Sequence, residues 1–156
     1  MIDQPTVAMR AATPDDADRI AGLFTDEGYP AGPSDIVARL GSFGGPDSAV
    51  MVAVADGEVL GFVAVHLVPR FEHGDRFARI VALVVDAGVR DRGIGRELMA
   101  EAERIATTAG AAFIEVTAGR HRADALHLYE AVGFQTGVAT YLRKKLGPAQ
   151  TDAKGS

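Results

Sequence analysis

The chain has 156 residues, of which 47% are apolar and 24% charged, and this fits one soluble domain with a hydrophobic core rather than a disordered protein. It contains no cysteine, which excludes disulfide scaffolds, thiolate zinc sites and cysteine nucleophiles. A net charge of −5 opposes nucleic-acid binding. The sequence has neither a signal-peptide pattern nor an apolar run of the ~20 residues that span a bilayer, so we expect a cytoplasmic protein without a membrane partner.

The first part of the chain predicts a strand followed by two helices. A short strand over Val7–Ala11 precedes Thr13, which suits the N-cap of a helix, and the turn-forming stretch Gly28–Pro33 ends that helix. Ser34 is then expected to cap a second short helix that continues to Leu40.

The middle of the chain has the pattern of three strands. Ser48–Ala55 and Val59–Val68 flank an Asp-Gly-Glu turn, and this arrangement predicts an antiparallel hairpin. Arg79–Val85 is a nearly continuous run of apolar, mostly β-branched residues, which predicts a strand that is covered on both faces.

The second half alternates helices with strands. We expect a helix over Ile94–Thr108, a strand over Phe113–Thr117, a helix over Arg122–Val132, and one or two final strands in Phe134–Leu146. A strand–helix–strand order requires parallel strands joined by right-handed crossovers. We therefore predict an α/β (or α+β) fold with one mixed central sheet, formed by a single domain over residues 1–146 with a disordered tail over residues 147–156.

Residues 84–98 predict a phosphate-binding turn. A buried strand ends there, and two glycines open an amphipathic helix whose first backbone N–H groups lack intrahelical partners and lie at the positive end of the helix dipole. Gly93 and Gly95 have no Cβ, so an oxyanion can approach those N–H groups closely. Arg90, Arg92 and Arg96 add three cations within seven residues. A basic helix start, with glycines used only for tight packing, is the alternative.

Two common phosphate-binding motifs do not fit this segment. A dinucleotide-binding fingerprint requires a third glycine where this chain has Leu98. A P-loop requires Lys and then Ser or Thr after its last glycine, but Gly95 is followed by Arg96 and Glu97.

The arrangement Arg90-x-x-Gly93-x-Gly95 after a strand resembles the acetyl-CoA motif of the GNAT superfamily of N-acetyltransferases. A second segment, Arg122-Ala-Asp-Ala125-Leu-His-Leu128-Tyr129-Glu-Ala-Val-Gly133-Phe134, resembles the family's Asn-x-x-Ala-x-x-Leu/Phe-Tyr-x-x-x-Gly-Phe. One helix and one strand separate the two segments, as in the family. The resemblance covers residues 78–146 well and the N-terminal half only through its order of elements.

This resemblance implies a GNAT-like fold, in which a central mixed sheet of six to seven strands is flanked by about four helices. It implies that acetyl-CoA is the acetyl donor and lies in a V-shaped opening between Ile80–Val85 and Phe113–Thr117. Exposed backbone groups of the first strand would pair with the pantetheine amides, and the N–H groups of the glycine turn would bind the pyrophosphate. The cofactor-binding residues implied in this way are Leu83, Val84, Val85, Arg90, Asp91, Arg92, Gly93, Ile94, Gly95, Arg96, Arg122 and Tyr129.

Tyr129 occupies the position of the family's tyrosine that protonates the departing CoA thiolate, so the resemblance implies that it is the catalytic general acid. The alternative is a tyrosine that only packs its helix against the sheet. Two positions depart from the family pattern, because Arg122 replaces the usual Asn and Val81 stands where many relatives carry a glutamate base.

The base that deprotonates the acceptor is therefore not assigned. The candidates are His66, His73 and His127, with Glu115 and Glu72 behind them, and each of these also fits an ordinary strand, loop or helix surface. We expect no metal site, since His121 and His127 are six residues apart and do not form an i, i+4 pair.

We predict an N-acetyltransferase that transfers the acetyl group of acetyl-CoA to a primary amine of a small molecule or protein, by direct attack within a ternary complex. No acetyl-enzyme is expected, because the chain has no Cys and no Ser in a Gly-x-Ser-x-Gly pattern. A non-catalytic acyl-CoA sensor is the competing hypothesis, and another kind of nucleotide-binding protein is the third. The sequence leaves the acceptor amine open, and a homodimer is the default expectation.

Overall fold

The computed structural model describes residues 6–118 and 123–148 and divides into two compact units, Met1–Thr117 and Ala118–Ser156. The prediction of a single domain over residues 1–146 stays a prediction, and residues 149–156 of the expected tail lie outside the described residues.

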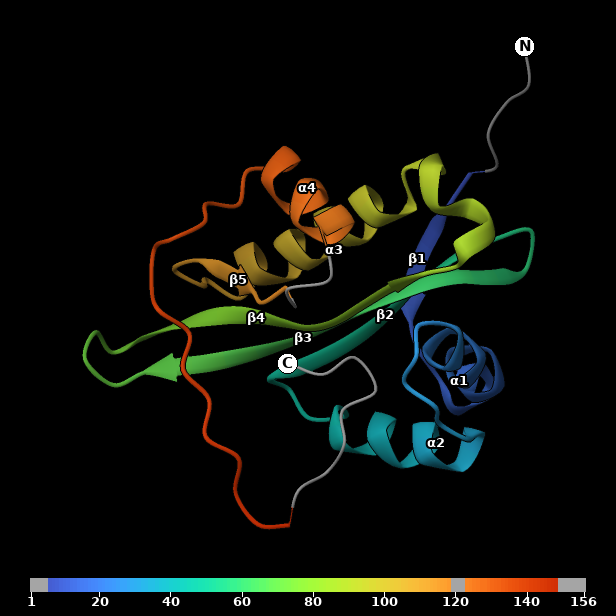
Figure 1. The fold of residues 1–156 in the computed structure, drawn as a ribbon, viewed down its shortest axis with the longest axis horizontal. Helices are drawn as coiled ribbons and strands as arrows, with labels where there is room; N and C mark the ends of the chain where they lie inside the picture. The colour runs from blue at the N-terminus through green and yellow to red at the C-terminus, as the bar shows by residue number, and fades with distance from the viewer. Residues whose placement is uncertain (1–5, 119–122, 149–156) are drawn as a thin grey trace. The chain divides into compact units, whose positions relative to one another are not determined.

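The elements are labelled in Figure 1. The first unit contains β1 (Ala8–Ala11), a 3-10 turn (Pro14–Asp16), α1 (Ala17–Asp26), α2 (Pro33–Ser42), β2 (Ser48–Ala55), β3 (Glu58–Arg70), β4 (Asp75–Val85), a second 3-10 segment (Ala87–Arg92), α3 (Ile94–Thr108) and β5 (Ile114–Val116). The second unit contains α4 (Ala123–Ala131).

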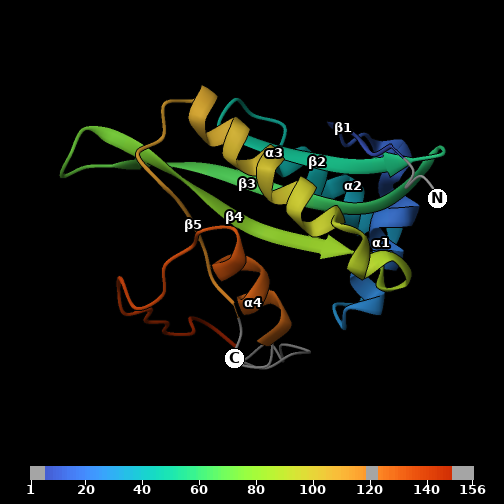
Figure 2. The same ribbon diagram turned by 90° about the horizontal axis from the view of Figure 1, so that it is seen from above.

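The first unit is built around a mixed sheet in the order β1-β2-β3-β4-β5. The first three pairings are antiparallel and the β4–β5 pairing is parallel, so the predicted mixed sheet and its parallel second half are confirmed. Helix α3 lies across one face of the sheet, and α1 and α2 cover part of the other face (Figures 1 and 2).

The expected strand count is wrong for the described residues. The sheet has five strands rather than six or seven, and residues 134–148 contain neither a strand nor a helix. Large apolar side chains in that stretch, such as Tyr141 and Leu142, are exposed. A strand-like sequence becomes a strand only when a neighbouring strand accepts its backbone hydrogen bonds, and propensity alone does not supply that neighbour.

The start of α2 differs from the predicted start. Ser34 does not cap the helix; Gly32 is the N-cap and Pro33 is the first helical residue. The Asp35 carboxylate accepts a hydrogen bond from the Gly32 N–H at 2.9 Å. Pro is favoured at this first position because its ring presets the helical φ and its missing N–H would have no partner there.

The first unit buries apolar side chains on both faces of its sheet. On one face, Leu23 of α1 and Ile36 of α2 pack in one cluster with Phe62 and Val84 of the sheet. On the other face, α3 contributes Leu98, which is fully buried. The strands therefore carry apolar residues on both sides, as the continuous apolar run in β4 predicts.

Gly61 of β3 lies where β4 and α3 leave no room for a side chain. A Cβ at this position would lie 2.7 Å from the backbone oxygen of Val84 and 3.1 Å from Cδ1 of Leu98. The backbone oxygen belongs to the adjacent strand and has little freedom to move. Any side chain at position 61 would therefore force β3 and β4 apart.

We predict that Gly61→Ala lowers the free energy of unfolding by ~1–3 kcal/mol, because the added methyl group overpacks this contact. Gly22→Ala is the matched control, since Gly22 is exposed in α1 and nothing lies within 4 Å of its Cβ position. Alanine should stabilise that helix by ~0.5–1 kcal/mol. Urea unfolding of both variants measures the difference, and equal stabilities would contradict the close approach.

Arg19 of α1 ties the helix to the end of the sheet. Its Nε donates to the backbone oxygen of Val59 at 2.8 Å, and its Nη2 forms a short ion pair with Asp86, the residue that follows β4. The Asp86 carboxylate also accepts the N–H of Gly88 at 2.7 Å. Arg19 first, and then the Gly88 N–H, lowers the pKa of Asp86 below its usual range.

We predict that Asp86→Asn destabilises the protein by ~1–2 kcal/mol at pH 7, because the variant loses the charged partner of Arg19. Since the pKa of Asp86 is lower in the folded state than in the unfolded state, its contribution is fully present above an ordinary Asp pKa of ~3.9 and is lost as the pH falls through the lower folded-state pKa. Urea unfolding at pH 7 and pH 3 should therefore show the two proteins converging in acid. A constant difference between them would refute this assignment.

Candidate functional site

The turn from β4 into α3 is held by its own side chains and by α1. Asp86 begins the turn with the contacts described above, and the 3-10 segment Ala87–Arg92 leads to Gly93. Gly93 has φ +80° and ψ 8°, a left-handed conformation that favours glycine. The sequence therefore places a glycine where the chain must reverse before it enters the helix.

The first turn of α3 presents unpaired backbone N–H groups. Glu97 is the first residue whose N–H donates to the carbonyl of Gly93, at 3.1 Å. The N–H groups of Ile94, Gly95 and Arg96 precede it and have no intrahelical acceptor, and no side chain caps this end of the helix. Nothing lies within 4 Å of the position that a Cβ of Gly93 would occupy. The site can therefore accept an anion through three backbone donors and the positive end of the helix dipole.

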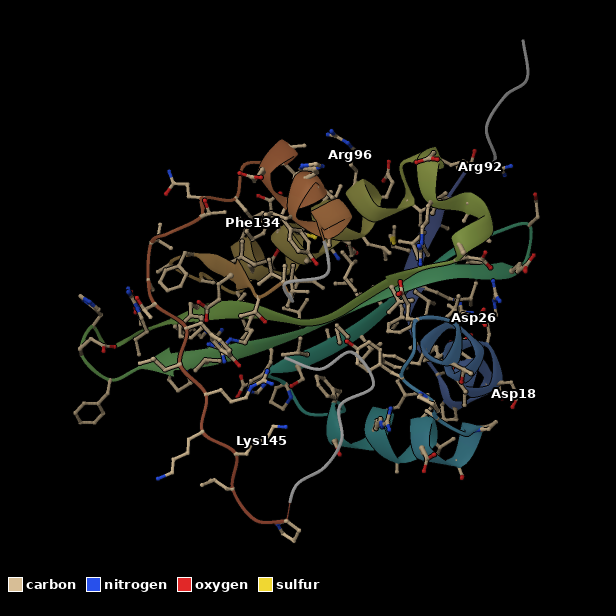
Figure 3. The ribbon with its side chains drawn as sticks, viewed as in Figure 1. Asp18, Asp26, Arg92, Arg96, Phe134 and Lys145 are labelled. Atoms are coloured by element: carbon tan, nitrogen blue, oxygen red, sulfur yellow. The ribbon has the colours of Figure 1, made fainter. Side chains whose placement is uncertain are left out.

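The three arginines of this segment have different surroundings. The Arg90 guanidinium donates to the Glu27 carboxylate at 2.8 Å, and Glu27 is buried at the end of α1. Arg92 and Arg96 are exposed and form no ion pair with the residues that the structure describes. Figure 3 shows Arg92 on the turn and Arg96 on the first turn of α3, both directed away from the sheet. Arg90 therefore anchors the turn, and Arg92 and Arg96 face solvent.

One edge of β4 is open beyond its pairing with β5. The parallel pairing ends at Ile80–Val116, while β4 continues to Val85. The Asp86 N–H donates to Leu60 on β3, so by strand alternation the backbone groups of Val84 also face β3.

The same alternation directs the N–H and C=O groups of Leu83 and Val85 toward the open edge. Of the three residues predicted to pair with pantetheine, these two have backbone groups on that side. Val84 instead directs its backbone oxygen at Gly61 and buries its side chain in the core.

Val81 lies at an irregularity in β4. Ala64 pairs with Ala82 and Val65 pairs with Ile80, so Val81 is the extra residue of a β-bulge. Val81 is 47% exposed, whereas Ile80 is buried. The bulge marks the end of the β4–β5 pairing, where the open edge begins.

Tyr129 belongs to the second unit and lies in α4. Its side chain is buried, and its ring lies 5.8 Å from that of Phe134. At the end of α4, the Phe134 N–H donates to the backbone oxygen of Tyr129 at 3.0 Å. Gly133 lies between them with φ +102°, a left-handed conformation that is common where a helix ends. The acid role of Tyr129 stays a prediction, and Arg122 lies outside the described residues.

A row of polar side chains crosses four strands on the sheet face opposite α3. Ser48, His66, Arg79 and Glu115 occupy one register position on β2, β3, β4 and β5, and we call these four residues the polar row. Ser48 Oγ lies 2.7 Å from His66 Nδ1, and Arg79 Nη2 donates to Glu115 Oε1 at 2.6 Å. Two of the five candidate bases, His66 and Glu115, therefore lie in one row.

The other candidate bases lie elsewhere. His73 and Glu72 are exposed in the turn between β3 and β4, and His127 lies in α4 of the second unit. Sequence reasoning missed the partners of His66 and the carboxylate that anchors Arg90. Ser48 and Glu27 carry no local motif, and only the strand register and the tertiary fold bring them to those partners.

The described residues contain neither a metal-binding cluster nor a membrane-spanning helix. No group of three or more His, Cys, Asp or Glu side chains is placed to hold a metal ion, among the residues for which the structure gives positions. In the same part of the chain, no helix has the length and apolar character that crossing a membrane demands.

The chain has relatives among characterised proteins and solved structures. It is 29% identical over 136 residues to an aminoalkylphosphonate N-acetyltransferase of Salmonella typhimurium, covering 84% of this chain and 86% of that protein. A transcriptional regulator from Bacillus halodurans superposes with a TM-score of 0.83 at 24% identity, covering 90% of this chain and 100% of that one. AAC(6')-Iy in complex with the bisubstrate analogue CoA-S-monomethyl-acetylneamine has a TM-score of 0.73 at 20% identity, covering 90% and 99%.

The family model described as the acetyltransferase (GNAT) family matches residues 15–134. This match spans both predicted motifs and most of the sheet, and the similar structures have the same fold. The chain therefore belongs to the acetyltransferase (GNAT) family, whose members are acyltransferase enzymes.

Proposed function

We propose that this protein transfers the acetyl group of acetyl-CoA to a primary amine, with the donor bound at the β4–α3 turn. The observation that carries the proposal is the set of three N–H groups at the start of α3 that have no partner among the described residues. They follow Gly93, where nothing lies within 4 Å of a Cβ position. A pyrophosphate is a doubly charged anion, and such N–H groups bind it without desolvating a buried cation.

The open edge of β4 supports the proposed course of the pantetheine arm. The N–H and C=O groups of Leu83 and Val85 point to that edge, and a pantetheine arm has amides that can pair with them as a strand would. Arg92 and Arg96 are the exposed cations nearest in sequence to the pyrophosphate position, and we assign them to the CoA phosphates. Arg122 stays a predicted phosphate contact.

The reaction we propose is direct attack of the amine on the thioester. The amine nitrogen forms a bond to the acetyl carbon, and the carbon–sulfur bond breaks as the thiolate departs. An ordinary thiol pKa near 8.5 makes the thiolate a fair leaving group, so a phenol such as Tyr129 gives moderate help by protonating it.

The relatives narrow the choice of acceptors to test. One is an aminoalkylphosphonate N-acetyltransferase, and one structural neighbour is bound to a CoA–neamine conjugate. We therefore propose a small-molecule primary amine as the acceptor class. A panel of 2-aminoethylphosphonate, neamine, a diamine and an amino-terminal peptide, assayed by release of free CoA thiol, tests this class.

Gly95→Glu should lower the affinity for acetyl-CoA at least 100-fold, because a carboxylate at the helix start repels the pyrophosphate and fills its position. Gly95 is preferred to Gly93 for this test, since Gly93 has a positive φ and any substitution there strains the backbone. Gly41→Glu is the control, at an open position in α2. Calorimetric titration with acetyl-CoA measures both, and unchanged affinity in Gly95→Glu would remove the donor site from this turn.

Tyr129→Phe should lower kcat at least tenfold while changing the affinity for acetyl-CoA less than threefold, because the phenol acts on the departing thiolate. Steady-state rates across pH, together with calorimetry, measure the two effects. An unaltered rate at every pH would show that the ring only packs against Phe134.

A sensor that binds acyl-CoA without turnover is the second candidate, and Val81 at the family's usual base position favours it. The same two measurements separate the candidates. A sensor would bind acetyl-CoA in the calorimeter and release no thiol with any amine of the panel.

A further inference from the structure

The polar row lies on the part of the sheet face that α1 and α2 leave uncovered. On the same face, α1 and α2 pack over Val52, Phe62 and Val84, which lie four or five residues further along β2, β3 and β4. His66 and Arg79 are both exposed. An acceptor can therefore reach the row from solvent without passing through the core.

The polar row also lies beside the expected position of the thioester. In the proposed function, the pyrophosphate lies at the start of α3 and the pantetheine arm follows β4 backward from Val85. We expect this course to bring the reactive end toward Val81, which lies four residues, or ~14 Å of extended strand, before Val85. Arg79 is paired with His66, and Val81 follows two residues later at the bulge, opposite Ala64 and Val65 on the strand of His66.

We propose that His66 is the catalytic base that takes the proton from the acceptor ammonium, and that Ser48 is its positioning residue. This inference rests on the proposed function. The 2.7 Å contact with Ser48 Oγ holds the imidazole through Nδ1. When Nδ1 donates its proton to that oxygen, the lone pair lies on Nε2, which has no partner among the side chains that the structure describes.

The charges that face His66 favour this residue as the base over Glu115, the carboxylate of the row. Ser48 on β2 is uncharged, and Arg79 on β4 is paired with Glu115 on β5 through two hydrogen bonds of 3.0 and 2.6 Å. Glu115 is thus engaged by Arg79, whereas His66 keeps a nitrogen available. An imidazole is also the side chain whose ordinary pKa allows it to accept and release protons near neutral pH.

The proton transfers balance with one proton released to water. The acceptor ammonium gives one proton to His66 Nε2, and the neutral amine then attacks the acetyl carbon. As the carbon–sulfur bond breaks, the new amide nitrogen loses its second proton and the thiolate gains one. The products are the acetamide and the CoA thiol, and His66 returns its proton to solvent.

A cavity beside Ser48 offers room for the carbon frame of a small acceptor. It has a volume of about 250 Å³ and is lined by Ser48 and Val50 of β2, by Leu40 of α2, and by Phe43 in the following loop, among others. Its size is close to the lower end of ordinary ligand sites. Ser48 therefore belongs both to this cavity and to the polar row.

The experiment compares kcat/KM across pH for wild type, His66→Gln, Ser48→Ala and His73→Gln, with the fastest amine of the panel above. In wild type, the acid limb should fall tenfold per pH unit, as expected when one imidazole must lose its proton. His66→Gln should drop ~100-fold at pH 7, and its acid limb should move up toward the pKa of the acceptor amine, because only amine that is already neutral can then react. Ser48→Ala should keep the limb with a smaller loss, and His73→Gln, in the exposed hairpin turn, should match wild type.

The outcomes separate this inference from the proposed function. Calorimetry with acetyl-CoA and urea unfolding check that each variant binds the donor and stays folded. If wild type binds no acetyl-CoA or acetylates no amine of the panel, the proposed function and this inference both fail. If transfer occurs and His66→Gln keeps the wild-type rate and acid limb, His66 is a structural strand residue and only this inference is overturned.

Discussion

The proposed donor site depends on a few backbone N–H groups at the start of α3 that have no partner among the described residues. A helix buried at that end would have to cap them with a side chain, but here no side chain does so. Asp86 and Gly93 allow this helix end to stay uncapped. The Asp86 carboxylate closes the preceding turn, and Gly93 reverses the chain in a left-handed conformation. Arg19 and Glu27 of α1 then hold the turn from outside. The proposed anion site is thereby built from main-chain atoms.

The sequence predicts the local elements of this site well. The helix over Ile94–Thr108 and the strand over Ser48–Ala55 have the observed bounds, because each depends on an apolar periodicity and on a glycine or turn at its ends. The position of the glycines at the start of α3 is likewise a local signal. Family membership follows from two motifs at the correct separation, since each motif is short but their combination is specific.

What the sequence does not predict depends on contacts between distant segments. The polar row arises because β2, β3, β4 and β5 meet in one particular register, and that register depends on a bulge at Val81 that leaves no local mark. The pairing of Arg90 with Glu27 is similar, since 63 residues separate them. The predicted strands in residues 134–146 are wrong for the opposite reason. The local pattern is strand-like, but no neighbouring strand pairs with it among the described residues.

The ion pair between Arg90 and Glu27 has a consequence for how this enzyme can diversify. Glu27 is the C-cap of a helix that borders the sheet face with the polar row, whereas Arg90 belongs to the turn that we propose as the nucleotide site. Substitutions that reshape α1 to admit a new acceptor therefore also alter the position of the β4–α3 turn, the proposed donor site. Position 27 must keep an anionic side chain while its neighbours vary, because otherwise Arg90 loses its counterion and the turn loses this contact with α1.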